Sequence, residues 1–532
     1  MALPLLPSRL LPERFSRQPL SSGFARIVLV LPVVLAGGCR AATPPLLSGL
    51  AAPDPLHWPV RAAPPVDPAQ PVLWVALASR LRPTTPVQLT AAGGMVTLVT
   101  AEGARYQAPQ LELHWRQQPM ESPLRLRRQV LGPFASHESA EEAAARWRQA
   151  GVRPVIAYPK DWEVWGPLEA PLPDGLGPAR RVEQDLRERS VLELRRASGP
   201  VVLDGPVTLD VPQGLRWQGG VFAGPFTLQP DAYGGWTLVE QVPLERYLQG
   251  VVPHEIGAGS PAAALAAQAV LARTWALRNR HRFAVDGYHL CSDTQCQVYS
   301  DPRQAGSAVR QAVSRTAGQV LAQNGEPIHA VYHASNGGVS ADEDEAWPLP
   351  ELGYLEPSLD LDGASVQGLT LPLDAQEVAA LLARRSGVVG ATHPLFRWQR
   401  QLDQVSLRKG LGARAASLGS PLKPVVLERG PSGRVVRLAI EGPGGRVVLE
   451  RDAIRRTYRQ LPSTLFVLAA SGAGSWSVVG GGFGHGSGLS QAGAIELAAR
   501  GWSVEQILNR YYPGARLVPI QTLPEEAHRG AL

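Results

Sequence analysis

Alternating apolar and polar positions dominate the first half of the chain and predict a series of short β-strands. The runs begin near residues 72, 87, 95, 201, 207, 226 and 236, with turn-forming residues between them. Such alternation is typical of a half-buried strand, because successive side chains point to opposite faces. Helices are predicted at 140–150, 260–281, 491–500 and 503–512, where a serine stands near each start as an N-cap. The pattern therefore predicts an α+β fold that is rich in β-structure.

Length and composition narrow the class of protein. A chain of 532 residues exceeds what one hydrophobic core normally supports, so we expect several domains. Hydrophobic residues make up 44% of the chain and charged residues 18%, which excludes wholesale disorder. The net charge of +6 is scattered, and no basic stripe with interleaved aromatic residues appears. We therefore expect no nucleic-acid partner.

The first 38 residues have the pattern of an export signal. Several arginines precede the apolar run 27–36, and two glycines and Cys39 follow it. This run is shorter than the roughly 20 residues that a membrane-spanning helix needs. We therefore expect an exported protein of the periplasm or cell envelope. Because Cys39 follows small residues, as at a lipoprotein processing site, a lipid anchor on Cys39 stands beside plain export as an alternative.

Composition divides the rest of the chain into a linker, two larger regions and a tail. Residues 39–70 are rich in alanine, proline and leucine and lack periodicity, as expected for a linker. We expect a β-rich region at 71–200, a second domain at 201–516 and a tail at 517–532.

A small β-α-β-β unit is predicted inside the first region, at about 128–165. A strand at 129–134 precedes a helix that Ser139 and Glu142 begin as a capping box, and two short strands follow Gly151. The order of these elements, with its "GPF" strand, resembles a SPOR-type peptidoglycan-binding repeat. An ordinary α+β insertion is the alternative.

Six blocks of distinctive sequence follow one another in the second domain. They are Tyr247-Leu-Gln-Gly-Val-Val-Pro-His-Glu255, 266–277, 293–299, 312–318, Tyr332-His-Ala-Ser-Asn-Gly-Gly338 and Gly482-Phe-Gly-His-Gly-Ser-Gly-Leu-Ser-Gln-Ala-Gly-Ala494. In this order the blocks resemble the stage II sporulation protein D and LytB amidase-enhancer family. Two positions depart from the family pattern, Ile256 in place of methionine and Trp275 in place of tyrosine, and neither is an acid or a base.

The resemblance implies that the protein cleaves peptidoglycan glycan strands by a lytic transglycosylase reaction, with Glu255 as the catalytic glutamate. Ordinary glycosidases use two carboxyl groups. A lytic transglycosylase can use one, because the C6 hydroxyl of muramic acid attacks within the same sugar and the glutamate acts first as acid and then as base. The alternative implied by the family name is a non-catalytic peptidoglycan-binding protein that stimulates a cell-wall amidase.

Other polar residues of these blocks are expected to bind the glycan strand: Gln268, Arg273, Gln297, Tyr299, Ser335, Asn336, His485, Ser490 and Gln491. Arg273 lies on a mostly apolar helix and needs a partner if it is buried, and Glu255 is one hypothesis for that partner. The acidic run 342–345 is either a solvated loop or the second carboxylate of a plain hydrolase.

Two cysteines remain beyond the amino-terminal segment, in the sequence Cys291-Ser-Asp-Thr-Gln-Cys296, with His289 just before them. In an oxidising compartment two nearby cysteines normally form a disulfide, which is the preferred prediction. A zinc site made by Cys291, Cys296 and His289 is one alternative, and a pair of free thiols is another. We expect that the protein requires no cofactor.

Overall fold

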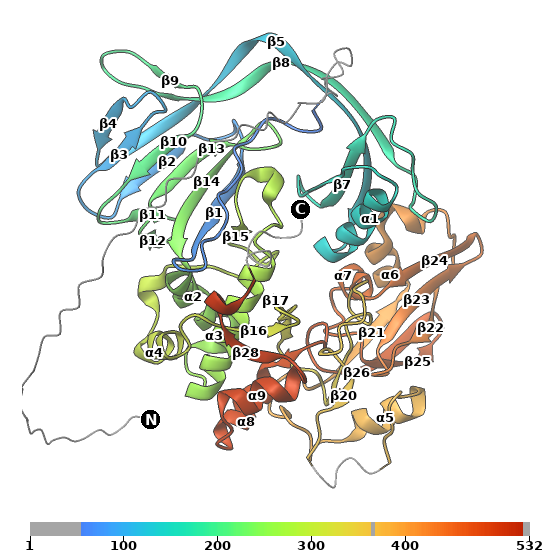
Figure 1. Cartoon of the computed structure of the whole chain (residues 1–532). Coiled ribbons are helices and arrows are strands. Elements are labelled where there is room, and N and C mark those ends of the chain that lie inside the picture. The colour runs from blue at the N-terminus through green and yellow to red at the C-terminus, as the bar shows by residue number, and fades with distance from the viewer. Residues whose placement is uncertain (1–54, 363–367, 525–532) are drawn as a thin grey trace, which may run out of the picture. The chain divides into compact units, whose positions relative to one another are not determined.

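A computed structural model describes residues 55–362 and 368–524 of the chain (Figure 1). The expected export signal at 1–38, Cys39 and the first part of the linker lie outside these residues. The described chain is an α+β fold, as predicted. No helix within it is long and apolar enough to cross a membrane.

A seven-stranded sheet joins segments from both sides of residue 200. Strand β1 (Val72–Leu81), the second from one edge, pairs antiparallel with β14 (Trp236–Pro243) and parallel with the edge strand β15 (Leu290–Cys291). Beyond β14 lie β13 (Phe226–Pro230), β10 (Val207–Asp210), β3 (Val96–Val99) and β4 (Arg105–Ala108). The expected domain boundary at residue 200 therefore does not coincide with a break in the sheet.

A second, eight-stranded sheet contains a long antiparallel ribbon that the sequence did not predict. Strand β5 (Gln110–Phe134) pairs with β8 (Arg180–Leu194) over most of its length (Figure 1). The stretch 114–125 of β5 contains no buried side chain, so its sequence carries no apolar alternation. The other strands are β2 (Val87–Ala91), β6 (Val155–Ala157), β7 (Trp162–Pro167), β9 (Val201–Leu203), β11 (Leu215–Trp217) and β12 (Gly220–Phe222).

The expected β-α-β-β unit is present at the end of this ribbon, and we call residues 128–167 the α1 module. Helix α1 (His137–Gln149) lies between the end of β5 and the pair β6 and β7. The helix begins three residues earlier than predicted, because Ser136 and not Ser139 is its N-cap and accepts a hydrogen bond from the Ser139 amide. Its likeness to a SPOR repeat stays a prediction.

Helix α3 (Ala262–Arg278) is the centre of the second domain. Its residues from Ala264 to Leu277 are all buried, against α2 (Leu244–Val252), α4 (Ser307–Arg315), α8 (Gln491–Ala499) and α9 (Val504–Tyr511). The helix begins after Pro261 and ends before the predicted 281, and Ser260 bonds to the Ile256 carbonyl instead of capping α3. Ser490 and Ser503 cap α8 and α9 as predicted.

Residues 334–488 leave and re-enter this domain at neighbouring points. Strands β18 (Tyr332–His333) and β27 (Leu489–Ser490) pair in parallel, so two of the sequence blocks lie side by side. Between them, the described residues form two three-stranded sheets and three α-helices, most of them around a separate apolar core. These elements are α5 (Ala375–Ala383), α6 (Gln404–Leu411), α7 (Asp452–Thr457), β21 (Arg397–Asp403), β22 (Lys423–Arg429), β23 (Val435–Gly442), β24 (Gly445–Glu450), β25 (Phe466–Gly472) and β26 (Ser475–Gly481).

The remaining strands are short connections. Strand β16 (Gln319–Gln323) joins β17 (Glu326–Pro327) and β28 (Arg516–Pro519) in a three-stranded sheet, and β19 (Val339–Ser340) pairs with β20 (Ser358–Leu359). The pairing of β16 with β28 fastens the end of the described chain against α3.

Candidate active site

Glu255 lies in a cavity of about 290 Å³. The residue belongs to the single π-helical turn Pro253–Gly257 that continues α2, a type of turn that often occurs at functional sites. The cavity is lined by residues of several blocks, Val298, Tyr332 and His485 among them, and by Ser136, His137, Glu138 and Trp162 of the α1 module. Segments that are far apart in the sequence therefore meet around one carboxyl group.

The environment of Glu255 suits a group that gives and takes a proton. Burial raises the pKa of Glu255 to about 7, although hydrogen bonds from the Val298 amide and the Tyr332 hydroxyl act in the opposite direction. Burial dominates because removing a carboxylate from water disfavours its charged form. Both protonation states of Glu255 are therefore populated near neutral pH.

A chain of buried hydrogen bonds lies behind Glu255. The Tyr332 hydroxyl accepts from Nε2 of Gln297 at 3.0 Å, and Oε1 of Gln297 accepts from the Tyr247 hydroxyl at 3.2 Å. Tyr299 packs on Tyr247, with ring centroids 5.0 Å apart, and donates to Glu240 at 2.9 Å. Gln297 and Tyr299, which we expected to contact the glycan, are buried in this chain and lie outside the cavity lining.

His485 lines the cavity, but its two ring nitrogens bond to the backbone. Nε2 donates to the Tyr332 carbonyl at 2.8 Å, and Nδ1 accepts from the Ser487 amide at 3.2 Å. Burial lowers the pKa of His485 to about 4, so the ring is neutral at physiological pH. The side chain of Trp347 packs against this ring with centroids 4.6 Å apart. His485 therefore fixes the glycine-rich loop beside Tyr332, which differs from the sugar hydrogen bond that we expected.

The glycines of this loop are needed for close packing. A Cβ atom at Gly488, where φ is +70°, would stand 2.1 Å from the Val331 carbonyl oxygen. A Cβ atom at Gly486 would stand 2.4 Å from the guanidinium of Arg434. Only glycine allows the backbone to approach so closely.

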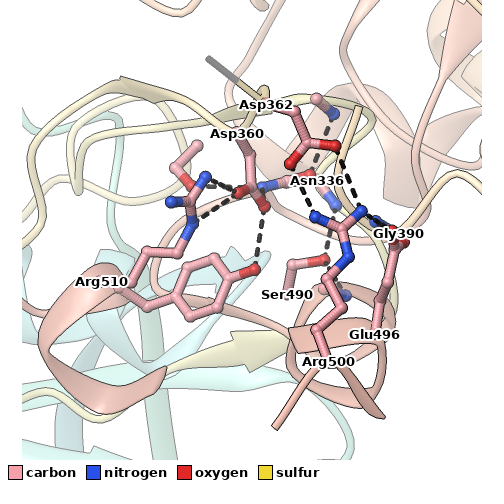
Figure 2. A network of polar contacts seen from close by, with 12 residues as sticks. Asn336, Asp360, Asp362, Gly390, Ser490, Glu496, Arg500 and Arg510 are labelled. Carbon is pink, nitrogen blue, oxygen red and sulfur yellow. Dashed lines mark hydrogen bonds and ion pairs between the residues drawn. The ribbon is translucent and has the colours of Figure 1, made fainter. Parts of the chain in front are cut away.

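Asn336 and Ser490 are buried in a network that holds the two neighbouring blocks together (Figure 2), and Ser335 beside them is buried with its hydroxyl accepting from the Gly337 amide at 3.4 Å. The side-chain amide of Asn336 donates to Asp360 at 2.9 Å, and the backbone amide of Asn336 donates to the Ser490 hydroxyl at 3.4 Å. Asp360 also accepts from Arg510 at 2.6 Å. These side chains shape the site from behind, and none of the three lines the cavity.

A second ion pair in Figure 2 fastens the same region to α8. Arg500 bonds to Asp362 at 2.7 Å and 3.2 Å and also contacts Glu496, which accepts from the Gly390 amide at 2.6 Å. Residues 334–488 are thereby tied to the helices that follow them.

Arg273 pairs with a different carboxylate from the one that we hypothesised. Its guanidinium bonds to both oxygens of Glu245, at 2.8 Å and 2.6 Å, and to the carbonyls of Ala269 and Gln319. The side chain is completely buried, so Glu255 is wrong as its partner. Gln268, also buried, accepts from Gln491 at 3.3 Å. All three lie outside the cavity lining.

The two cysteines form the predicted disulfide, Cys291–Cys296. His289 accepts from the Trp74 amide at 3.0 Å and donates to the Pro64 carbonyl at 2.9 Å, so its two nitrogens are occupied. The described residues contain no group of three or more histidine, cysteine, aspartate or glutamate side chains placed to hold a metal. The residues present therefore do not fit the zinc alternative.

The acidic run 342–345 does not supply a second carboxylate to the cavity. Glu345 is buried and accepts from the Ser432 hydroxyl at 2.7 Å, and Asp344 pairs with Arg451 at 2.6 Å. The second carboxylate of the cavity is Glu138, which comes from the α1 module. Its sequence position, far ahead of the six blocks, gave no signal for this role.

Comparisons with known proteins agree with the six blocks. A family model described as "Stage II sporulation protein" matches residues 232–322, and one described as a domain of unknown function matches 341–488. The chain is 28% identical over 300 residues to the amidase enhancer of Bacillus subtilis, which spans 51% of this chain and 40% of that protein. It is 30% identical over 294 residues to the stage II sporulation protein D of Bacillus amyloliquefaciens, covering 52% of this chain and 74% of the relative.

The shared region thus makes up less than half of the amidase enhancer and about three quarters of the sporulation protein. The stage II sporulation protein D of Bacillus subtilis gives a similar match, with 28% identity over 295 residues and 75% of the relative covered. On these matches and the geometry around Glu255, the chain belongs to the stage II sporulation protein D family.

Proposed function

We propose that the protein cleaves peptidoglycan glycan strands in the cell envelope by a lytic transglycosylase reaction. The observation that carries the proposal is the position of Glu255 in a cavity where burial brings its pKa to about 7. A general acid–base group works best when its pKa lies near the working pH. The names of the relatives, which concern sporulation and an amidase enhancer, support a role at the cell wall.

The reaction needs one carboxyl group that acts twice. Protonated Glu255 gives its proton to the glycosidic oxygen, and the bond between that oxygen and C1 of the muramic acid breaks. The C6 hydroxyl of the same sugar then attacks C1, and its proton passes to the Glu255 carboxylate. The reaction releases a 1,6-anhydro sugar and restores protonated Glu255, so no water and no second carboxylate take part.

Tyr332 and the Val298 amide hold Glu255 in place for these two steps. Each donates a hydrogen bond to the carboxyl group, which stabilises the carboxylate that is left after the first proton transfer. The chain through Gln297 to Tyr247 fixes the Tyr332 hydroxyl in turn. The acid is therefore oriented before the substrate arrives.

Replacing Glu255 by glutamine tests the proposal, because E255Q keeps the shape of the side chain but has no transferable proton. Cleavage of purified glycan strands should fall by roughly 10²- to 10⁴-fold, the range typical of a lost general acid. A matched control is E505Q, which changes an exposed glutamate on α9. Mass spectrometry of the products of the unmodified protein should detect 1,6-anhydromuramic acid ends.

Reducing muramic acid ends that carry solvent oxygen would contradict the transglycosylase reaction and indicate hydrolysis. Full activity of E255Q would remove Glu255 from the mechanism. If the unmodified protein cleaved no strands but stimulated a purified cell-wall amidase, the enhancer function would replace the enzymatic one.

A further inference from the structure

The α1 module places a charged pair inside the Glu255 cavity. Glu138, in the first turn of α1, forms an ion pair with Arg282, which follows α3, and both residues line the cavity. The side chain of Glu138 is 16% exposed and that of Arg282 is 7% exposed. The pair is therefore shielded from bulk water, and the accessible parts of both side chains face the space beside Glu255.

The pair is held in a fixed arrangement. Nε of Arg282 donates to Oδ1 of Asn279 at 2.9 Å, and the guanidinium lies 5.1 Å from the ring centroid of Trp275, another cavity residue. On the module side, Trp162 donates to Gln295 at 3.1 Å and packs against Phe283 with centroids 5.4 Å apart. We call the side of the cavity that the α1 module and the residues around Arg282 form together the wall. The two parts of the wall are thus held together without any ligand.

The module cannot move away from this wall as a tethered domain would. Trp147 and Trp162 of the module belong to one apolar cluster with Trp74, Phe283 and Cys291. Separating the module would expose this cluster to water, which is unfavourable in proportion to the apolar area. The wall therefore remains part of the cavity in the folded protein.

The charges of the wall compensate each other. Burial alone would raise the pKa of Glu138, but the charge of Arg282 and the hydrogen bonds from Arg282 and from the Glu138 amide together keep the pKa below its ordinary value, so Glu138 is ionised. Arg456, a further cationic residue of the cavity, pairs with Asp452 at 2.6 Å. The wall thus offers hydrogen-bond donors and acceptors without net charge, which suits an uncharged polar ligand better than an anion.

We propose that Glu138, Arg282 and Trp275 form a subsite for a neutral N-acetylhexosamine ring of the glycan strand, next to the muramic acid whose glycosidic oxygen Glu255 protonates. A carboxylate has about four acceptor positions and a guanidinium five N–H donors, so the pair retains capacity for hydroxyl and acetamido groups. The subsite rests on the proposed function and extends it, because it assigns part of substrate binding to the α1 module.

The test measures binding of tetra-N-acetylchitotetraose, an uncharged N-acetylglucosamine oligomer, by titration calorimetry in the full chain carrying E255Q, which consumes no ligand. Adding E138Q should weaken binding at least tenfold. The matched control is E141Q on the same helix, because Glu141 pairs with Arg148 on the surface, where the two side chains are 40% and 41% exposed. E141Q should bind the oligomer like its parent.

Removing Glu138 leaves Arg282 without its partner and so also affects folding. The exchanged pair E138R/R282E separates the two effects, because it restores an ion pair but reverses its donors and acceptors. We expect its melting temperature to recover toward that of the parent while binding stays weak. Recovery of binding together with stability would overturn the subsite and leave the pair a purely structural role.

The subsite and the catalytic proposal can fail separately. Failure of the parent chain to bind chitotetraose, or equal binding by E138Q and E141Q, would overturn the subsite whatever the cleavage assay gives. If the unmodified protein left glycan strands intact while E138Q still lost binding tenfold, the subsite would stand and the cleavage reaction would fall.

Discussion

Tyr332 contacts Glu255 through its side chain and His485 through its backbone. Its hydroxyl donates to the Glu255 carboxyl group, and its carbonyl oxygen accepts from Nε2 of His485 at 2.8 Å. Because Tyr332 lies in β18, which pairs with β27 of the glycine-rich block, the position of the acid depends on contact between two distant sequence blocks.

The first prediction concerns Y332F. The hydrogen bond from the Tyr332 hydroxyl lowers the pKa of Glu255. Y332F removes this hydrogen bond and should therefore raise the pKa of Glu255 above about 7. Since the acid form of Glu255 starts the reaction, kcat/KM should fall as pH rises through the pKa, and this decline should move to higher pH in Y332F. We also expect kcat to fall by roughly 10- to 100-fold, as for a lost hydrogen bond to a charged group. The pH profile of strand cleavage measures both effects.

Y106F, on β4 and away from the cavity, is the control for this variant. An unshifted decline in Y332F would mean that Tyr332 does not set the pKa of the catalytic group.

The second prediction is that Glu255 makes the fold less stable at high pH. Its pKa is about 7 when folded and near 4.5 when unfolded, so between these values the unfolded chain releases a proton that the folded chain keeps. The free energy of unfolding should therefore decline through this window in the unmodified protein, and E255Q should lack this part of the decline. Urea unfolding at pH 4 and pH 8 measures it: the two proteins should differ less at pH 4, with E255Q the more stable at pH 8.

The third prediction assigns Arg273 to stability. E245Q leaves the buried guanidinium of Arg273 without its carboxylate. Because the Glu245 side chain is 37% exposed and water screens the pair, the free energy of unfolding should fall by roughly 1–3 kcal/mol, less than for a pair buried on both sides. The apolar double variant R273M/E245L should recover much of this loss. Binding of glycan strands by the folded fraction of both variants should equal that of the unmodified protein, and a selective loss of binding would return Arg273 to the substrate site.

The fourth prediction is that the α1 module and the second domain unfold together. W147A removes a completely buried indole from the cluster that includes Phe283 and Cys291, and should cost roughly 3–5 kcal/mol. For the same reason we expect that deleting residues 128–165 disrupts the fold and does not merely weaken attachment to the cell wall. Calorimetry should record a single unfolding transition of the whole protein at a lower temperature. A transition of the second domain at an unchanged temperature would show that the module unfolds separately.

Local signals in the sequence predicted several details correctly. Ser490 and Ser503 cap their helices, since a cap depends on the few residues that follow it. Cys291 and Cys296 are close in the chain and form their disulfide. The family blocks pointed to Glu255 as the candidate acid, which stays a prediction, and the structure adds its position in the cavity and its burial.

Features that depend on distant parts of the chain were not predictable. Glu255 is closer to Arg273 in the sequence than Glu245 is, yet Glu245 reaches Arg273 because α2 packs against α3. Glu138 gave no signal, because its role arises only when the module docks against the residues after α3. The ribbon of β5 and β8 was missed because the middle of β5 has no buried side chain, and strand pairing there follows from backbone hydrogen bonds.

The position of β1 has a consequence for how the chain is made. This strand is synthesised before β14 and β15, yet it lies between them in the finished sheet, with Val75 opposite Glu240 on one side and Leu290 on the other. Its buried residues Leu73 to Leu77 therefore lack at least one of the neighbouring strands β14 and β15 until more than half of the chain has been synthesised. Unpaired apolar strands of this kind are prone to aggregate. A nascent chain that stops before residue 290 should thus depend on chaperones until synthesis resumes.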